Sequence, residues 1–252
     1  MNGTGLRAAT AVLALLALAA CASVAPDYAR EKRLGDEFVS SLVEGKVVTI
    51  ETQSGLKFLG ILTEAKKPRA AVILVHGLGV HPDFGLIGDL RARLPGRGYT
   101  TLSIQMPVLA ADADRSQYAA IFAEADQRIA AALDYLRPRV PVKVAIVSHS
   151  MGSRMVNDFV KQHPDAPIMA WVPLSISSGE FDALPPLRFP VFDIYAQKDL
   201  DVVLKGAPGR AEVLRRMHGS KQAMVYRTDH FFAKKEKEVA ALIDKLLTPL
   251  AK

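Results

Sequence analysis

At residues 142–153 the sequence reads VKVAIVSHSMGS, and this stretch decides the fold. The apolar, β-branched run at 142–147 predicts a buried strand, and a helix is predicted from about residue 154. Ser150 lies between them among small residues. A sharp strand-to-helix turn of this kind strains the backbone at the serine and projects its hydroxyl out of the sheet. Ser150 is therefore the candidate nucleophile.

The residues around Ser150 depart from the G-x-S-x-G pattern at one position. Gly152 occupies the second glycine position, but Ser148 stands where the first glycine would be. Both positions must be small because strand and helix approach each other there. Serine is small enough to fit, so we expect the turn to form. Taken alone, the segment is also compatible with an ordinary turn that has no catalytic role.

Strands and helices alternate on both sides of this turn. This alternation predicts an α/β fold with a mostly parallel central sheet of about eight strands, an antiparallel N-terminal hairpin and helices on both faces. Ligands in such sheets bind at the carboxyl ends of the strands. The predicted hairpin pairs residues 46–52 and 56–65 around Ser54-Gly55; further strands are predicted at 70–77, 99–107, 142–147, 168–176, 191–196 and 222–228, and helices at 84–94, 116–136, 154–163, 211–217 and at the carboxyl end of the chain.

The turn at the end of the strand at 70–77 is a candidate for stabilising negative charge. It reads HGLG at 76–79, and a glycine-containing turn can bring a backbone N–H alongside the nucleophile. A second N–H comes from the residue after the nucleophile, and two such donors form an oxyanion hole. We assign the donors to Leu78 and Met151.

Two more strand ends carry polar residues suited to acid–base chemistry. Asp199 follows the strand at 191–196, and His230 follows the strand at 222–228. The order Ser150, Asp199, His230 resembles the α/β-hydrolase superfamily over residues 46–252. The resemblance implies that Ser150 attacks an acyl carbonyl, His230 transfers its proton and Asp199 orients the histidine. Residues 81–107 are also similar to a group of bacterial proteins known only as a domain of unknown function.

The acid and the base each have rivals in the sequence. Asp201 lies two residues beyond Asp199, and Asp193 lies inside the strand. We favour Asp199 because it stands where the loop at the strand end begins. Among the histidines we expect a packing role for His149, a place at the border of the pocket for His81, and local hydrogen bonds that brace the turn for His76.

No cofactor or metal is expected. The histidines lack the spacing of metal ligands, and the chain has no phosphate-binding glycine-rich loop. Only residues 177–190 separate the strands at 168–176 and 191–196, which is too short for a cap domain. We therefore expect a small acyl substrate.

Composition excludes several other classes of protein. Half of the 252 residues are hydrophobic and 23% are charged, which indicates a globular chain rather than a disordered or collagen-like one. The single cysteine rules out a disulfide framework and a cysteine-based zinc cluster in a monomer. The net charge of +6 includes no basic run that would indicate nucleic-acid binding, and we expect a monomer with a solvated surface.

The amino terminus predicts a route to the cell envelope. Residues 8–20 have the length of a signal-peptide core and are too short to span a bilayer. The residues LAAC at 18–21 resemble a bacterial lipobox. In that family the signal is cut before the cysteine, here Cys21, which then carries acyl chains such as palmitate. We predict a lipoprotein signal at 1–20 and a tether at 21–45 that could contain a short helix. Since Ala22 and Ser23 follow the cysteine, the resemblance implies membrane anchoring at the periplasmic face of the outer membrane.

Two functions remain from the sequence. The first is a serine hydrolase of the cell envelope, carboxylesterase-like, which cleaves an ester, thioester or amide through an acyl-enzyme. The second is a catalytically inactive, hydrolase-like envelope lipoprotein with a binding or structural role. The complete set of Ser150, His230, Asp199 and the turn at 76–79 favours catalysis.

Overall fold

A computed structural model describes residues 24–140 and 142–251, so the predicted signal at 1–20 and the lipid site Cys21 lie outside the described residues. Eight strands form one sheet in the order β1-β2-β4-β3-β5-β6-β7-β8. They are β1 (Lys46–Glu51), β2 (Lys57–Thr63), β3 (Ala70–Val75), β4 (Tyr99–Ile104), β5 (Val144–His149), β6 (Ala170–Leu174), β7 (Phe192–Lys198) and β8 (Lys221–Asp229).

The sheet has the predicted mixture of strand directions. β1 and β2 form an antiparallel hairpin, and β2 pairs antiparallel with β4. All the remaining pairings, from β4 through β8, are parallel. The carboxyl ends of β3, β5, β7 and β8 therefore meet at one edge, where the sequence predicts the chemistry.

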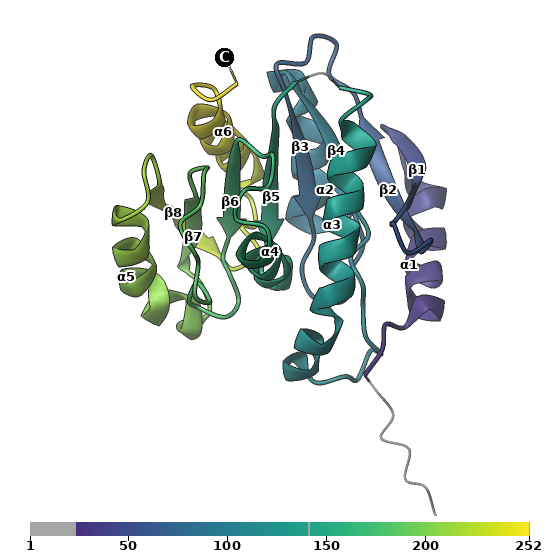
Figure 1. Cartoon of the computed structure of the whole chain (residues 1–252), viewed down its shortest axis with the longest axis horizontal. Coiled ribbons are helices and arrows are strands. Elements are labelled where there is room, and N and C mark those ends of the chain that lie inside the picture. Colours follow the sequence, from purple (N-terminus) through teal and green to yellow (C-terminus); the bar gives the residue numbers. More distant parts are fainter. Residues whose placement is uncertain (1–23, 141, 252) are drawn as a thin grey trace, which may run out of the picture.

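Helices cover both faces of the sheet (Figure 1). One apolar cluster lies between the sheet and α3 and α4, and a second lies between the sheet and α2 and α6. β3 and β5 are buried along their whole lengths, as expected of parallel strands covered on both sides. The helices are α1 (Tyr28–Ser41), α2 (Gly85–Arg93), α3 (Phe122–Leu136), α4 (Met151–Gln162), α5 (Asp201–Arg215) and α6 (Glu236–Leu247), with 3₁₀ turns at Pro95–Arg97 and Arg115–Ile121.

α5 begins well before the predicted helix at 211–217. Pro208 lies inside it, and Gly206 and Gly209 flank the proline. These residues have the lowest helix propensities, so the sequence pattern favours a later start. Gly206 is required by packing, because a Cβ there would lie 1.8 Å from the carbonyl oxygen of Gly179. A tertiary contact therefore outweighs local propensity.

The segment predicted as a tether contains a helix that packs on the domain. α1 is capped by Asp27, whose carboxylate accepts from the Arg30 N–H at 2.8 Å. Phe38 is 1% exposed, and its ring stacks on His81 at 5.4 Å. Within residues 24–45, helix α1 is preceded by residues 24–27 and followed by residues 42–45, which lie outside any helix or strand. Residues 28–41 of the predicted tether therefore form a helix that is docked on the domain.

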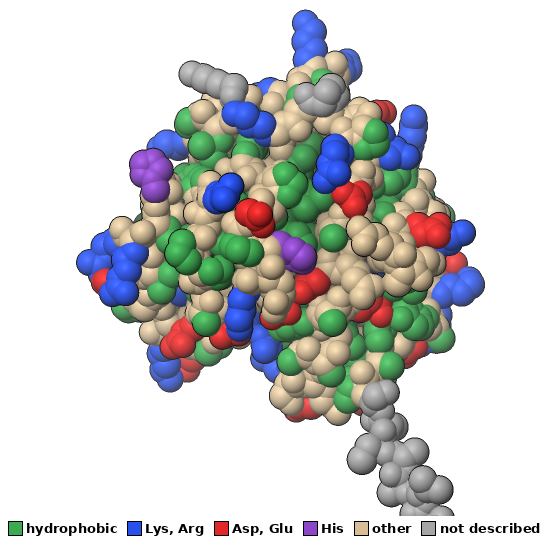
Figure 2. Space-filling view, in the orientation of Figure 1, with side chains coloured by type: hydrophobic (Ala, Val, Ile, Leu, Met, Phe, Trp, Pro, Cys, Tyr) green, Lys and Arg blue, Asp and Glu red, His purple; other side chains and the backbone are tan. Residues whose placement is uncertain are grey.

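The surface carries both signs of charge. On the face shown in Figure 2, basic and acidic side chains are mixed over the helices and loops. None of the helices in the described part of the chain is long and apolar enough to cross a membrane.

Candidate active site

Ser150 occupies a strained turn between β5 and α4. Its φ of 53° and ψ of −116° lie outside the regions that ordinary residues adopt. The turn brings α4 very close to β3, and a Cβ on Gly152 would lie 2.2 Å from the carbonyl oxygen of His76. Only glycine can occupy position 152 at this approach, which is the steric demand that the sequence pattern reflects.

Three polar side chains from three strand ends meet at this turn. The Oγ of Ser150 lies 2.8 Å from Nε2 of His230. The Nδ1 of the same histidine lies 2.6 Å from Oδ1 of Asp199. All three residues are buried. The structure thus assembles, in one hydrogen-bonded chain, the three residues that the sequence singles out.

Asp199 is held by more than the histidine. Its Oδ2 accepts hydrogen bonds from the Ser175 hydroxyl and, at 2.9 Å, from the Ala196 N–H, while Oδ1 accepts from the Leu200 N–H at 2.8 Å. Burial alone would raise the pKa of Asp199. The hydrogen bonds from His230, Ser175 and Ala196 outweigh that effect and hold the pKa below its ordinary value. The carboxylate is therefore fixed in orientation and kept ionised.

The two other aspartates considered for this position lie elsewhere. Asp201 is exposed at the first turn of α5. Asp193 is fully buried in β7 and pairs with Arg210 at 2.8 Å. Asp199 is the carboxylate that contacts His230.

The turn after β3 approaches Ser150 from the other side. Leu78 and Ser150 line the same cavity, and a Cβ on Gly77 would lie 3.4 Å from that of Ser150. Met151 is the first residue of α4, so its N–H has no partner within the helix. The backbone groups expected to act as donors thus lie beside the serine.

His76 braces this turn, as the sequence predicts. Its Nδ1 donates to the carbonyl oxygen of Gly77 at 2.9 Å, and its Nε2 accepts from the Met106 N–H at 2.9 Å. Complete burial lowers its pKa to about 3, so the ring is neutral and this tautomer is fixed. The Gly77 carbonyl and the Leu78 N–H belong to one planar peptide unit and point in opposite directions. His76 therefore sets the direction of the Leu78 N–H.

A cavity of about 520 Å³ opens over Ser150 and His230. Apart from these polar groups its walls are largely apolar, with Asp89, Arg115 and Glu236 also along the lining. Phe84 and Phe231 are 50% and 63% exposed, so aromatic rings border the opening. The apolar lining comes from Leu78, Val80, Phe84, Leu86, Ile87 and Phe231.

Parts of this protein are similar to known proteins in sequence and in structure. Residues 21–126 match the family model described as a protein of unknown function, DUF3530. A serine hydrolase without a lid from Xanthomonas campestris is similar over 82% of this chain and 95% of its own, with a TM-score of 0.65 and 13% identity. A dienelactone hydrolase from Anabaena variabilis is similar over 82% and 97%, with a TM-score of 0.65 and 18% identity.

The chain has the α/β-hydrolase fold. Est1E from Butyrivibrio proteoclasticus, in its structure with ferulic acid, shares this fold over 81% of this chain and 98% of its own, with a TM-score of 0.64 and 17% identity. Among curated proteins, none matches the sequence. As in the hydrolase without a lid, the described residues include no cap domain, since β6 and β7 are joined by residues 175–191 alone, without a helix.

Two other histidines of this hydrolase fold, His149 and His81, have structural contacts. The Nε2 of His149 donates to the carbonyl oxygen of His230 at 2.9 Å, and burial lowers its pKa to about 4. His149 thus supports the loop that carries His230, in addition to the packing role that the sequence predicts. His81 packs between Phe38 and Phe84, beside the cavity. Among the described residues, no group of three or more His, Cys, Asp or Glu side chains could hold a metal ion.

Two supporting residues were missed by the sequence analysis. Ser175 follows β6 with a φ of 49°, and its hydroxyl contacts Asp199. Trp171 in β6 contacts Ser148. The sequence signal for Ser175 is a polar residue directly after an apolar strand. Its partner Asp199 could not be predicted, because their contact depends on β6 and β7 being neighbours in the sheet.

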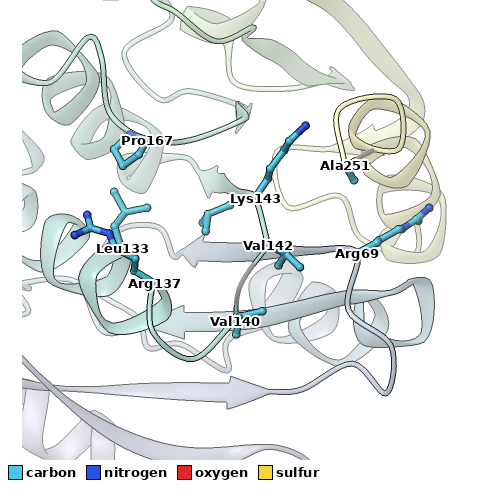
Figure 3. A pocket seen from close by; sticks show the side chains of 9 residues that line it. Arg69, Leu133, Arg137, Val140, Val142, Lys143, Pro167 and Ala251 are labelled. Atoms are coloured by element: carbon cyan, nitrogen blue, oxygen red, sulfur yellow. The ribbon is translucent and has the colours of Figure 1, made fainter.

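A second cavity, of about 570 Å³, lies at the opposite edge of the sheet (Figure 3). It is bordered by the start of β5 and by Arg69, just before β3. Arg69 is paired with Asp244, and the Lys143 ammonium donates to the Leu250 carbonyl. These amino-terminal strand ends lie away from Ser150, so this cavity does not belong to the candidate active site.

Proposed function

We propose that this protein is a serine hydrolase of the cell envelope that cleaves an ester, thioester or amide through an acyl-enzyme. The observation that carries the proposal is the continuous chain from Ser150 Oγ through His230 to Asp199, with distances of 2.8 and 2.6 Å, inside a hydrolase fold. The contact between Ser150 and His230 is short enough for proton transfer without further rearrangement, and the contact between His230 and Asp199 orients the imidazole ring.

The proposed chemistry follows from these positions. Nε2 of His230 removes the proton of Ser150 as Oγ attacks the acyl carbonyl, and Asp199 stabilises the imidazolium that forms. The negative oxygen of the tetrahedral intermediate accepts from the N–H groups of Leu78 and Met151. His230 then gives the proton to the leaving group. A water molecule, activated by the same histidine, hydrolyses the acyl-enzyme.

The cavity supports a small or flexible acyl substrate with an apolar group. Its volume of about 520 Å³ falls in the range of ordinary small-molecule sites. The walls offer aromatic and aliphatic contact from Phe84, Ile87 and Phe231. Since the described residues form no cap, we expect simple saturation with soluble short-chain aryl esters and no jump in rate on emulsified long-chain esters.

An envelope location rests on the sequence. The lipobox-like residues at 18–21 support lipid attachment at Cys21 and a place at the periplasmic face of the outer membrane. Two acyl chains anchor a protein stably where one does not.

The experiment that tests the proposal is covalent labelling with a fluorophosphonate probe. Purified protein lacking residues 1–20 should react, with the label on Ser150, and should hydrolyse short-chain aryl esters. Ser150→Ala should lose both reactions, whereas Ser153→Ala, at a nearby buried serine, should keep them. Labelling of Ser150→Ala at the wild-type rate would refute the assignment. A wild-type protein that neither labels nor hydrolyses any of a broad ester panel would instead favour the binding role.

A further inference from the structure

Arg30 of α1 connects two loops at the carboxyl edge of the sheet. Its Nη2 donates to the carbonyl oxygen of Gly79 at 2.9 Å, and its Nη1 donates to that of Leu109 at 2.6 Å. The first loop follows β3 and the second follows β4. A guanidinium has its donors in a rigid planar fork, so two bonds of this kind fix the relative positions of both loops.

The loop after β3 is fitted to the guanidinium. Gly79 has a φ of +65°, and a Cβ there would lie 3.0 Å from Nη2 of Arg30. The arginine therefore lies directly against the backbone of the residue that follows Leu78. A shift of this backbone changes where the Leu78 N–H points.

We propose that Arg30 is a positioning residue for the oxyanion turn, holding residues 77–79 so that the Leu78 N–H points at the developing negative charge. The inference rests on the proposed function. It adds an N-terminal helix to the parts that support the chemistry. His76 holds the Gly77 carbonyl on one side of Leu78, and Arg30 holds the Gly79 carbonyl on the other.

α1 is fixed firmly enough to serve as the support. At its start, the Asp27 N–H donates to the Val108 carbonyl at 2.7 Å. One turn later, the Glu31 carboxylate pairs with Arg128 at 2.9 Å, and the Arg128 side chain is completely buried. At the far end, Phe38 stacks on His81. Contacts at both ends therefore prevent the helix from following a displaced loop.

The direct test compares Arg30→Met with Arg33→Met, which removes an exposed arginine from the same helix. Because an oxyanion hole acts on the transition state, Arg30→Met should lower kcat for an aryl ester by about tenfold to a hundredfold, with KM little changed. Arg33→Met should match the wild type. Arg30→Lys, which keeps the charge but not the fork, should fall between them. Equal kcat values for Arg30→Met and Arg33→Met would overturn the proposal.

Two further measurements separate positioning from general stability. The affinity for a boronic acid, whose adduct with Ser150 places an oxygen in the oxyanion position, should fall with kcat in Arg30→Met. Any change in the midpoint of thermal unfolding of Arg30→Met should be too small to explain the loss of kcat and of boronate affinity. If Arg30→Met does not fold, the same measurements are made on Arg30→Lys. A kcat and a boronate affinity equal to those of the wild type in Arg30→Lys would contradict the inference.

Amide hydrogen exchange keeps this test independent of the proposed function. Exchange at residues 77–80 should be faster in Arg30→Met, or in Arg30→Lys, than in Arg33→Met, whether or not the protein hydrolyses esters. Wild-type enzyme with no activity on any ester would count against the proposed function alone. Unchanged exchange at 77–80 in the Arg30 variants would count against Arg30 as the support of the turn.

Discussion

The indole N–H of Trp171 donates to the Ser148 hydroxyl oxygen at 2.9 Å, with both residues completely buried. The Ser148 hydroxyl in turn donates to Ser153 Oγ at 3.1 Å. Serine in place of the first glycine therefore links β6, the carboxyl end of β5 and the first turn of α4. The departure from the motif satisfies a buried donor that a glycine would leave without a partner.

Ser148→Ala should lower stability while leaving the chemistry in place. The substitution leaves the Trp171 N–H buried and unpaired, which costs about 1–3 kcal/mol in the free energy of unfolding. Urea unfolding measures this loss, and labelling of Ser150 by the fluorophosphonate should continue. In Ser148→Ala/Trp171→Phe the two losses should not add, because the orphaned donor is gone. Additive losses would show that the hydrogen bond contributes nothing.

Asp199→Asn should lower turnover by up to about four orders of magnitude while the protein stays folded. The amide cannot stabilise the imidazolium, and it presents a donor where Nδ1–H of His230 needs an acceptor. Asp201→Asn is the matched control, since Asp201 is exposed two residues away. Steady-state kinetics on an aryl ester give both values. A larger loss in Asp201→Asn would move the acid to that position.

His149 should make the protein less stable in mild acid. Its pKa is lowered from 6.5 to about 4 by burial, then by His230. Between those values the unfolded chain binds a proton that the folded protein does not. The stability due to the neutral ring is therefore complete above pH 6.5 and is lost as the pH falls toward 4, by about 1.4 kcal/mol per pH unit.

The measurement compares urea unfolding of the wild type and His149→Gln at pH 7 and pH 5. Glutamine keeps a donor for the His230 carbonyl but does not titrate. The comparison is needed because burial, then Asp158, raises the pKa of Asp126 to about 8, which acts in the opposite direction. The wild type should lose more stability than the variant on acidification. Parallel pH profiles would mean that His149 titrates alike in the folded and unfolded chains.

Gly152→Ala should abolish folding or distort the turn at Ser150. The added Cβ would lie 2.2 Å from the His76 carbonyl oxygen and 2.8 Å from that of Val75, and neither backbone group can move freely. Gly209→Ala is the control, because a Cβ there meets nothing within 4 Å. That exposed helix position should gain up to about 1 kcal/mol. Thermal unfolding and fluorophosphonate labelling report both, and a stable, reactive Gly152→Ala would refute the packing at the turn.

Cys21→Ser should prevent lipid attachment. In cells fed radiolabelled palmitate, the wild type should incorporate label and fractionate with membranes. The variant should carry no label, and it should be released or remain as the uncleaved precursor. Unchanged membrane retention of the variant would mean that another segment, such as residues 8–25, holds it there.

The sequence predicts the sheet and the central residues of the site because both follow from local rules. Apolar runs bounded by turns give the strands, and polar residues at strand ends give Ser150, Asp199 and His230. The predicted helix at 211–217 begins too late because the glycines and Pro208 of α5 are typical of a loop. Gly206 is needed because of its close approach to Gly179, and this approach exists only in the folded protein.

The supporting contacts were beyond sequence reasoning because they join distant parts of the chain. Arg30 reaches carbonyl groups 49 and 79 residues away. Ser175 meets Asp199 only once β6 and β7 lie side by side. Neither side chain belongs to a motif, and neither partner can be deduced from spacing.

The docking of α1 also sets how far the proposed enzyme can stand from a membrane. Asp27 is fixed to Val108, at the edge of the sheet that carries Ser150. A lipid on Cys21 would leave only six residues of slack, and an extended chain covers at most about 3.3–3.6 Å per residue. Asp27 could then lie no farther than about 20 Å from the anchoring point, where a free tether over 21–45 would allow roughly 85 Å. Under the proposed anchoring, the domain would stay close to the membrane surface.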